Sequence, residues 1–381
     1  MVFLTAVNRF RRAVSRVART HYPPFIFGIT RLDYGIPIFV FHDVDREGFA
    51  RDLEFLRQNG YRTLTTEEFV SLSQAGRRKP VVLLTFDDAR RNFWDVAFPI
   101  LREFDARATL FVPTAWMAEP RSDGGVCIPN AEDRRGFMSW EQLRNCQRSG
   151  LVDVQLHGCR HPLVYTGARC IGFASPRLLA RHDLYDWPMR REGGHDVLGR
   201  PLPGTPVYEA EPLLSADRRL LENEAVAEEC RRLVASEGGA EFFLRPDWQR
   251  VLAQVHRRLQ GIYGGMRHVA DREFQALVRS EFVLAREAFA VELGTQPRYF
   301  AYPWMLGSDR SLQAAVETGM RALFGVGFDF GRARRVSRAL LAFGRVKGDW
   351  LRFMPGAGRL RLREVVPRKV RLFFSSQHLA H

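Results

Sequence analysis

The chain alternates between short apolar runs and longer segments whose apolar residues recur every three or four positions. Continuous runs of four to six apolar residues indicate strands buried on both faces, and the three-to-four period indicates helices. In the first part of the chain the predicted strands are 36–41, 62–64, 81–86, 108–112 and 151–156, and the predicted helices are 46–59, a segment through Glu67 and Glu68, 92–104 and 140–148. Strands that alternate with helices at this spacing predict parallel βα units, in an open sheet or a barrel.

The same pattern returns near the end of the chain. A helix over Asp271–Leu293 ends at Gly294, and a short aromatic strand over 298–302 is halted by Pro303. Ser308 then caps a helix that runs through Glu317, and a strand over 321–326 follows.

The segment between residues 165 and 270 departs from the alternation. Residues 176–209 are predicted to form a long loop over the active edge, and residues 213–235 and 246–261 are predicted helices separated by Gly238 and Gly239. Two interpretations of this segment stay open. It is either an insertion that binds substrate or an added helical segment without that role. The predicted organisation is a segment 1–30, a domain 31–346 interrupted by the insertion 165–270, and a basic tail 347–381.

Charge adds information about partners and location. The formal net charge is +14, and arginine carries nearly all of the positive charge, since the only lysines are Lys79, Lys347 and Lys369. The excess favours acidic partners such as anionic lipid headgroups or charged glycans, whereas no motif supports nucleic-acid binding, so none is expected. Five cysteines without a Cys-x-x-Cys pair favour a reducing compartment.

The first 22 residues are basic and amphipathic. Arginines interrupt the apolar run that a signal peptide needs, so a cytoplasmic location is expected. One apolar face surrounded by arginines predicts either peripheral contact with an anionic membrane at its inner surface or a helix packed on the protein's own core. No stretch is long and apolar enough to span a bilayer.

Two adjacent carboxylates, Asp87 and Asp88, follow the most apolar predicted strand. Buried charges are costly unless they are paired or bound to a metal, and neighbouring like charges raise that cost. Helix capping could account for one of the two residues. The pair therefore favours chemistry at the end of this strand.

Two histidines, His157 and His161, follow another predicted strand. On one helical turn, residues four apart project to the same side, so both imidazoles could reach one metal ion. The carboxyl ends of parallel strands carry the active site in barrels and the ligand crevice in open sheets. One carboxylate and two imidazoles form a three-ligand set suited to zinc or a similar divalent ion.

These motifs together resemble the polysaccharide deacetylase family, the NodB-homology group of carbohydrate esterases. The resemblance is carried by Thr-Phe-Asp-Asp at 85–88, Ala-Thr-Leu-Phe-Val-Pro at 108–113, His-Gly-Cys-Arg-His at 157–161 and Pro303-Trp304, and by the opening strand with His42 and Asn-Gly-Tyr at 59–61. The resemblance covers about 34–165 and 272–346. Within the family, the chain resembles a bacterial subset that acts in surface-glycan or secondary-metabolite clusters. It implies a distorted (β/α) barrel with fewer than eight strands.

The resemblance also implies roles for individual residues. Asp88, His157 and His161 would hold Zn²⁺, or another divalent ion such as Co²⁺ or Ni²⁺. Asp87 would be the general base, and the backbone N–H of Trp304 would stabilise the oxyanion. Tyr302, Pro303 and Trp187 are the candidate substrate-binding residues, and Tyr185 and Tyr208 are further candidates for stacking on a sugar.

The chain departs from the family pattern in three respects. Ala301 stands where many members have an arginine, and Arg345 is the candidate to replace it beside Asp87. Ala89 replaces the usual glycine after the Asp pair. The late Leu-x-His motif, whose histidine would protonate the leaving amine, has no match, and His42 is the candidate substitute. The sequence thus predicts a metal-dependent N-deacetylase acting on an acetylated amino sugar of a glycan, a lipid-linked saccharide or a natural product. The alternative is a catalytically weak glycan- or membrane-binding protein.

Overall fold

A computed structural model of the chain describes residues 24–27, 35–75, 80–117, 134–330 and 334–361. The N-terminal segment 1–22 and residues 362–381 of the basic tail lie outside the described residues, so their interpretation stays a prediction, as do the predicted domain boundaries. The chain folds into two compact units. One unit comprises Glu141–Gln155 and the described parts of 17–112 and 321–381, and the other comprises 156–320 and the described parts of 113–140. Among the described residues, no helix combines the length and apolar character needed to cross a bilayer.

The main sheet is mostly parallel and has the order β14-β15-β13-β12-β5-β4-β3-β1-β16, with β2 paired to β3. At one edge of the sheet, β14 and β15 pair antiparallel. This mixed α/β architecture confirms the predicted fold class, a distorted (β/α) barrel of the NodB type. The expected strand number, fewer than eight, is wrong, because ten strands within the described residues form this sheet. The strands are β1 (Ile38–Phe41), β2 (Arg62–Thr63), β3 (Val81–Phe86), β4 (Ala108–Val112), β5 (Val152–Leu156), β12 (Tyr299–Ala301), β13 (Ala322–Phe330), β14 (Arg334–Arg335), β15 (Leu341–Gly344) and β16 (Val346–Lys347).

The central strands are buried because their sequences are apolar on both faces. Every residue of β1, β3 and β4 is buried. Phe41 and Phe86, which face each other across β1 and β3, stack with ring centroids 5.1 Å apart, and Phe49 packs edge-on against both rings. Phe49 belongs to α2 (Arg46–Gln58), which begins where the Asp45 side chain accepts a hydrogen bond from the Gly48 N–H.

Most predicted helices have the expected bounds. They are α3 (Thr66–Ala75), α6 (Trp140–Arg148), α10 (Asp271–Leu293) and α11 (Asp309–Glu317). Gly294 ends α10 with φ 64°, a left-handed conformation that suits glycine. Ser308 and Ser311 cap α11 reciprocally. The predicted helix 92–104 differs, because it begins as a π-helical turn, η2 (Phe93–Ala97), before α4 (Phe98–Glu103).

The insertion differs most from the prediction. Residues 176–209 are not a long loop, because they form a helix and parts of two antiparallel pairs, and the helix predicted from 213 begins at 224. The elements are β6 (Leu163–Phe173) paired with β9 (Pro206–Pro212), β7 (Arg190–Glu192) paired with β8 (His195–Val197), β10 (Leu220–Leu221) paired with β11 (Arg267–His268), α7 (Pro176–Arg181), α8 (Glu224–Ser236) and α9 (Trp248–Tyr263). The strands β7, β8, β10 and β11, of two or three residues each, are too short to show a period of apolar residues.

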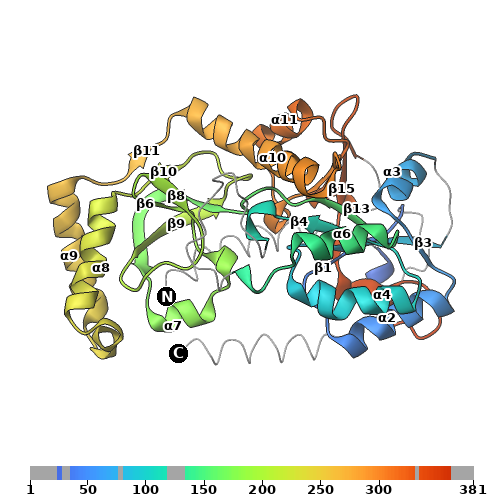
Figure 1. The fold of residues 1–381 in the computed structure, drawn as a ribbon, viewed down its shortest axis with the longest axis horizontal. Helices are drawn as coiled ribbons and strands as arrows, with labels where there is room; N and C mark the ends of the chain where they lie inside the picture. Colours follow the sequence, from blue (N-terminus) through green and yellow to red (C-terminus); the bar gives the residue numbers. More distant parts are fainter. Residues whose placement is uncertain (1–23, 28–34, 76–79, 118–133, 331–333, 362–381) are drawn as a thin grey trace. The chain divides into compact units, whose positions relative to one another are not determined.

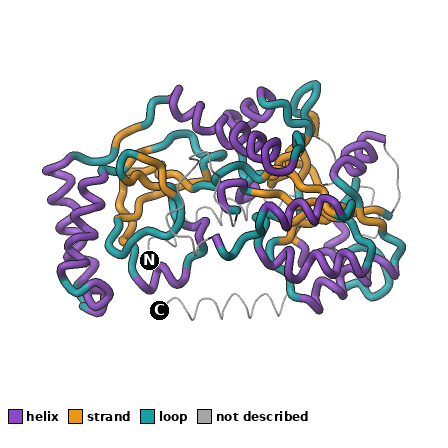
Figure 2. Tube along the Cα trace, in the orientation of Figure 1, coloured by secondary structure: helices purple, strands orange, loops and turns teal. Residues whose placement is uncertain are grey.

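Helices α8 and α9 lie side by side, as Figures 1 and 2 show. Short 3-10 turns complete the fold at η1 (Pro24–Phe27), η3 (Thr114–Trp116), η4 (Leu184–Asp186), η5 (Gly239–Leu244), η6 (Pro303–Met305) and η7 (Gly348–Phe353). A cluster that includes Cys230, Leu252 and Phe242 fills the space between these two helices and η5.

His256 of α9 is buried at the edge of this cluster. Its Nε2 is hydrogen-bonded to the Tyr208 hydroxyl at 2.8 Å, and its ring packs edge-on against Phe173. Burial lowers the pKa of His256, because the charged imidazolium loses solvation. The folded protein therefore favours the neutral ring.

We predict that His256 makes stability depend on pH. Since its pKa is lower in the folded state, the unfolded chain takes up the proton first as pH falls through about 6.5, the ordinary value for histidine. The free energy of unfolding should fall from pH 7.5 to pH 5.5, by at most about 1.4 kcal/mol per pH unit from this group. His256→Gln keeps a hydrogen-bonding side chain without titrating, so urea unfolding of this variant should show a shallower pH slope. Equal slopes would contradict the assignment.

Candidate functional site

The Asp pair ends β3 inside the sheet. The Asp87 N–H donates to the Phe41 carbonyl at 3.0 Å, which extends the pairing of β3 with β1, and both carboxylates are almost fully buried. Asp88 and Ala89 then adopt φ values of 74° and 48°, so the chain turns sharply at the strand end. The following helical turn has Asn92 as its N-cap, without a side-chain capping bond. Capping therefore does not account for the two aspartates.

Arg345 compensates the charge of Asp87. Its Nη1 donates to Oδ1 at 2.6 Å and its Nη2 to Oδ2 at 2.7 Å, and the Arg345 side chain is fully buried. The guanidinium also lies 5.6 Å from the centroid of the Phe111 ring. The predicted contact between Arg345 and Asp87 is confirmed. Such a two-pronged, charge-assisted pair fixes both the orientation and the ionised form of the carboxylate.

The two histidines follow β5 in a loop. The prediction that one helical turn brings them together is wrong, because residues 157–162 contain no helix. Positive φ values at Gly158 (86°) and His161 (49°) turn the loop back instead. His157 Nδ1 lies 2.8 Å from the Ala301 carbonyl oxygen. Since a carbonyl can only accept, Nδ1 carries the proton, and the lone pair of His157 is on Nε2, where it can bind a metal.

A turn after β4 holds the carbonyl side of this loop. The Gly158 carbonyl accepts from the Thr114 N–H at 3.2 Å and the Cys159 carbonyl from the Ala115 N–H at 2.8 Å. The Trp116 indole Nε1–H donates to the Arg160 carbonyl at 2.7 Å. The role of the η3 residues in holding this loop was not predicted from the sequence. Their position directly after the Ala-Thr-Leu-Phe-Val-Pro motif could have indicated it.

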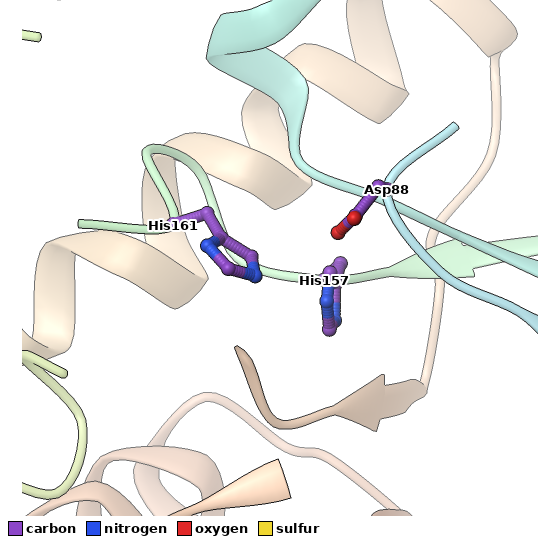
Figure 3. Close-up of side chains that lie close together, drawn as sticks. All are labelled: Asp88, His157 and His161. Carbon is purple, nitrogen blue, oxygen red and sulfur yellow. The ribbon is translucent and has the colours of Figure 1, made fainter. Parts of the chain in front are cut away.

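Asp88, His157 and His161 form a group that could hold a metal ion. Each is buried and offers one ligand atom, and these atoms lie within 4.8 Å of one another. Figure 3 shows the carboxylate of Asp88 directed toward the two imidazoles. The donor set, one carboxylate and two imidazoles, fits zinc and similar divalent ions and leaves coordination positions for water or substrate. Arg90 Nε lies 3.5 Å from Asp88 Oδ2 and balances part of its charge.

Aromatic rings pack against His161. The Tyr185 ring stacks on the imidazole at 4.0 Å between centroids and an interplanar angle of 23°, and the Trp304 ring lies at 4.1 Å and 50°. Tyr185 is itself held edge-on by Trp116 at 5.0 Å. These contacts restrict the rotation of a candidate metal ligand.

The proposed sugar-stacking role of three aromatic residues is not supported by their burial. Trp187 is only 2% exposed and packs with Ala174 and Val207, so its faces are covered by the protein's own core. Tyr208 is buried against Tyr165 and His256. Tyr185 is buried against His161. The burial of these rings does not favour stacking on a sugar, and the assignment of Trp187 as a substrate-binding residue stays a prediction.

The third motif forms a strained turn after β12. Tyr302 is 1% exposed, burial raises its pKa well above the ordinary value for tyrosine, and a Cβ on Gly307 would lie 2.7 Å from its ring. Pro303 is buried as well. Both side chains are therefore covered by the protein, and their assignment as substrate-binding residues stays a prediction. Trp304 has φ 50° and is partly exposed.

His42 lies beside the Asp pair in strand order. It follows Phe41, the last residue of β1, whose register partner is Phe86, the residue before Asp87. His42 is exposed, unlike the metal-ligand candidates. The structure thus places it at the carboxyl end of the strand next to that of Asp87.

Comparisons with known proteins agree with the motifs. Residues 74–176 match the polysaccharide deacetylase family. The poly-beta-1,6-N-acetyl-D-glucosamine N-deacetylase of Escherichia coli (strain K12) is 32% identical over 114 residues, which cover 29% of this chain and 16% of that protein. The enzyme of the same name from Staphylococcus epidermidis is 26% identical over 117 residues, which cover 30% of this chain and 37% of that protein. The alignments therefore span much less than half of these relatives.

A solved structure shares the fold over a longer range. The de-N-acetylase from Aggregatibacter actinomycetemcomitans aligns with 82% of this chain and 95% of its own, with a TM-score of 0.50 and 15% sequence identity. At this identity the likeness shows the fold alone. The family match over residues 74–176 and the shared fold confirm the resemblance, and this chain contains a region of the polysaccharide deacetylase family.

Proposed function

We propose that this protein is a metal-dependent hydrolase that removes the N-acetyl group from an amino sugar of a glycan, a lipid-linked saccharide or a glycosylated natural product. The observation that carries the proposal is the buried group of Asp88, His157 and His161, with Asp87 next to Asp88 and held by Arg345. The names of the relatives, which are N-deacetylases of poly-beta-1,6-N-acetyl-D-glucosamine, support an acetylated amino sugar as the substrate class.

Asp88, His157 and His161 would hold a divalent ion, with Zn²⁺ as our first candidate and Co²⁺ or Ni²⁺ as alternatives. When bound, such an ion supplies Lewis acidity toward an acyl oxygen and lowers the pKa of water. His157 is prepared for this role by its Nδ1–H bond to the Ala301 carbonyl. Hydrogen bonds of this kind orient the ring and fix its tautomer before the metal arrives.

Asp87 would act as the general base. Arg345 donates one hydrogen bond to each carboxylate oxygen, and its positive charge favours the ionised form, which is the form that can accept a proton from water. The guanidinium holds the carboxylate in one orientation, which is what proton transfer over a short distance requires. The backbone N–H of Trp304, set by the turn at Pro303–Met305, would stabilise the developing oxyanion.

His42 would deliver a proton to the leaving amine. Its exposure and its place beside Asp87 in strand order support this assignment. The insertion would contribute to substrate binding. Peripheral contact of the N-terminal segment with an anionic membrane remains a proposal from the sequence. A catalytically weak glycan-binding protein is the second candidate, and the missing Leu-x-His motif is the observation in its favour.

Metal analysis tests the binding site. The purified protein is expected to contain about one divalent ion per chain, as a three-ligand site predicts. The double variant His157→Ala/His161→Ala should lose it, because one carboxylate remains. The matched control, His195→Ala/His268→Ala, removes two exposed imidazoles and should keep it. Full occupancy in the first variant, measured by elemental analysis, would exclude this site.

Acetate release tests the reaction and the role of Asp87. Zinc-loaded protein should release acetate from acetylated amino-sugar oligomers. Asp87→Asn should keep the ion and lower kcat by about 10²–10⁴-fold, the usual contribution of a general base. Asp95→Asn, which changes an exposed carboxylate paired with Arg91, is the control and should leave the rate unchanged. If the wild type binds glycan but releases no acetate, the binding-protein alternative is favoured.

Substitution tests the role of His42. A general acid donates its proton in the transition state, so His42→Gln should reduce kcat by on the order of 10²-fold while metal content stays the same. An unchanged kcat in His42→Gln would show that the amine receives its proton from another group.

A further inference from the structure

Glu281 is a carboxylate in the middle of α10 that is fully buried. A buried charge is costly unless ionic and hydrogen-bonding partners surround it. Its direct ionic partner is Arg160, the residue before His161, whose Nε donates to Oε1 at 2.5 Å. Arg160 Nη2 also donates to the Ser280 hydroxyl. The ion pair joins α10 to the loop that carries both candidate histidine ligands.

The second oxygen of Glu281 binds the backbone of that loop. Oε2 accepts from the Cys159 N–H at 3.0 Å and from the Arg160 N–H at 2.8 Å. On the other side, the carbonyls of residues 158–160 accept from Thr114, Ala115 and Trp116. The polar backbone groups between the two histidines are therefore held from two directions. A buried loop without regular structure needs such partners to keep one conformation.

Gly158 allows the carboxylate to approach this closely. A Cβ at this position would lie 3.1 Å from Glu281 Oε2, and the φ of 86° is one that other residues rarely adopt. A side chain at 158 would displace the carboxylate from the two amides. Gly158 and Glu281 therefore form one arrangement, although they are 123 positions apart in the chain.

We propose that Glu281 is the positioning residue of the candidate metal site. By accepting from the two amides between His157 and His161, its carboxylate sets the distance and orientation of the two imidazoles before a metal binds. This inference rests on the proposed function, because it assigns these histidines as ligands. An ion pair that only balanced the charge of Arg160 would not need hydrogen bonds from the Cys159 and Arg160 amides to Glu281. These two hydrogen bonds therefore distinguish a positioning role from that of a structural ion pair.

Two double variants separate these roles. In both, Arg160→Met removes the guanidinium, so neither leaves a buried charge without a partner. Arg160→Met/Glu281→Gln keeps one carbonyl oxygen that can accept from both amides, whereas Arg160→Met/Glu281→Leu has none. Zinc affinity of the metal-free proteins, measured by competition with a chelating dye, should be about 10–100-fold weaker in the Leu variant than in the Gln variant, the usual cost of losing a residue that orients metal ligands.

Amide hydrogen exchange provides a readout that needs no metal. The Cys159 and Arg160 amides should exchange slowly in the wild type and the Gln variant and faster in the Leu variant. If zinc affinity and exchange are the same in both variants, the proposal is wrong. If the wild type binds no zinc but the exchange difference is present, the proposed function fails while Glu281 still sets the loop.

Gly158→Ala provides a second test if the double variants do not fold. It keeps both charges but places a methyl group against Oε2, so it should weaken zinc binding and speed exchange of the same two amides. Unchanged zinc affinity in folded Gly158→Ala would contradict the role of Glu281.

Discussion

The structure depends on how two adjacent carboxylates are accommodated at the end of a strand buried on both faces. Arg345, which comes much later in the chain, donates a hydrogen bond to each carboxylate oxygen of Asp87. Asp88 turns out of the strand with φ 74° and points toward two imidazoles. Like charges on neighbouring residues are thus separated into two environments, one that pairs a carboxylate with a guanidinium and one that could hold a cation.

Backbone strain is concentrated in the same motifs. Among the described residues other than glycine, those with positive φ are Asp88, Ala89, Asp105, His161, Trp304 and Met305, and all but Asp105 lie in the three motifs or directly beside them. Each such conformation costs on the order of 1–2 kcal/mol. Ala89 is informative, because it stands where the resemblance expects glycine and adopts φ 48°, so the turn is kept at a cost that glycine would avoid. The surrounding hydrogen bonds make this strain tolerable.

The sequence predicted those parts of the fold whose signals are local. The apolar run of β3 and the capped helices α10 and α11 matched their predicted bounds, because a strand of six residues and a helix with a cap each carry their own pattern. The pairs β7–β8 and β10–β11 were missed, because two or three residues carry none. Contacts between distant residues need either a family resemblance, as for Arg345, or the three-dimensional structure, as for Glu281, whose position in a helix looks like that of any surface glutamate.

The physical features of the site favour catalysis over simple binding. Binding a glycan requires an exposed surface with hydrogen-bonding groups and stacking rings, and the three aromatic candidates in the insertion, Trp187, Tyr185 and Tyr208, are buried. A buried ion pair is often no more stabilising than apolar residues of the same volume, and strained residues lower stability. The Asp87–Arg345 pair, the turn at Asp88 and the oriented imidazole of His157 are therefore not explained by stability alone. They fit the proposed hydrolysis of an amide, because they place an oriented carboxylate beside a group that could hold a metal ion.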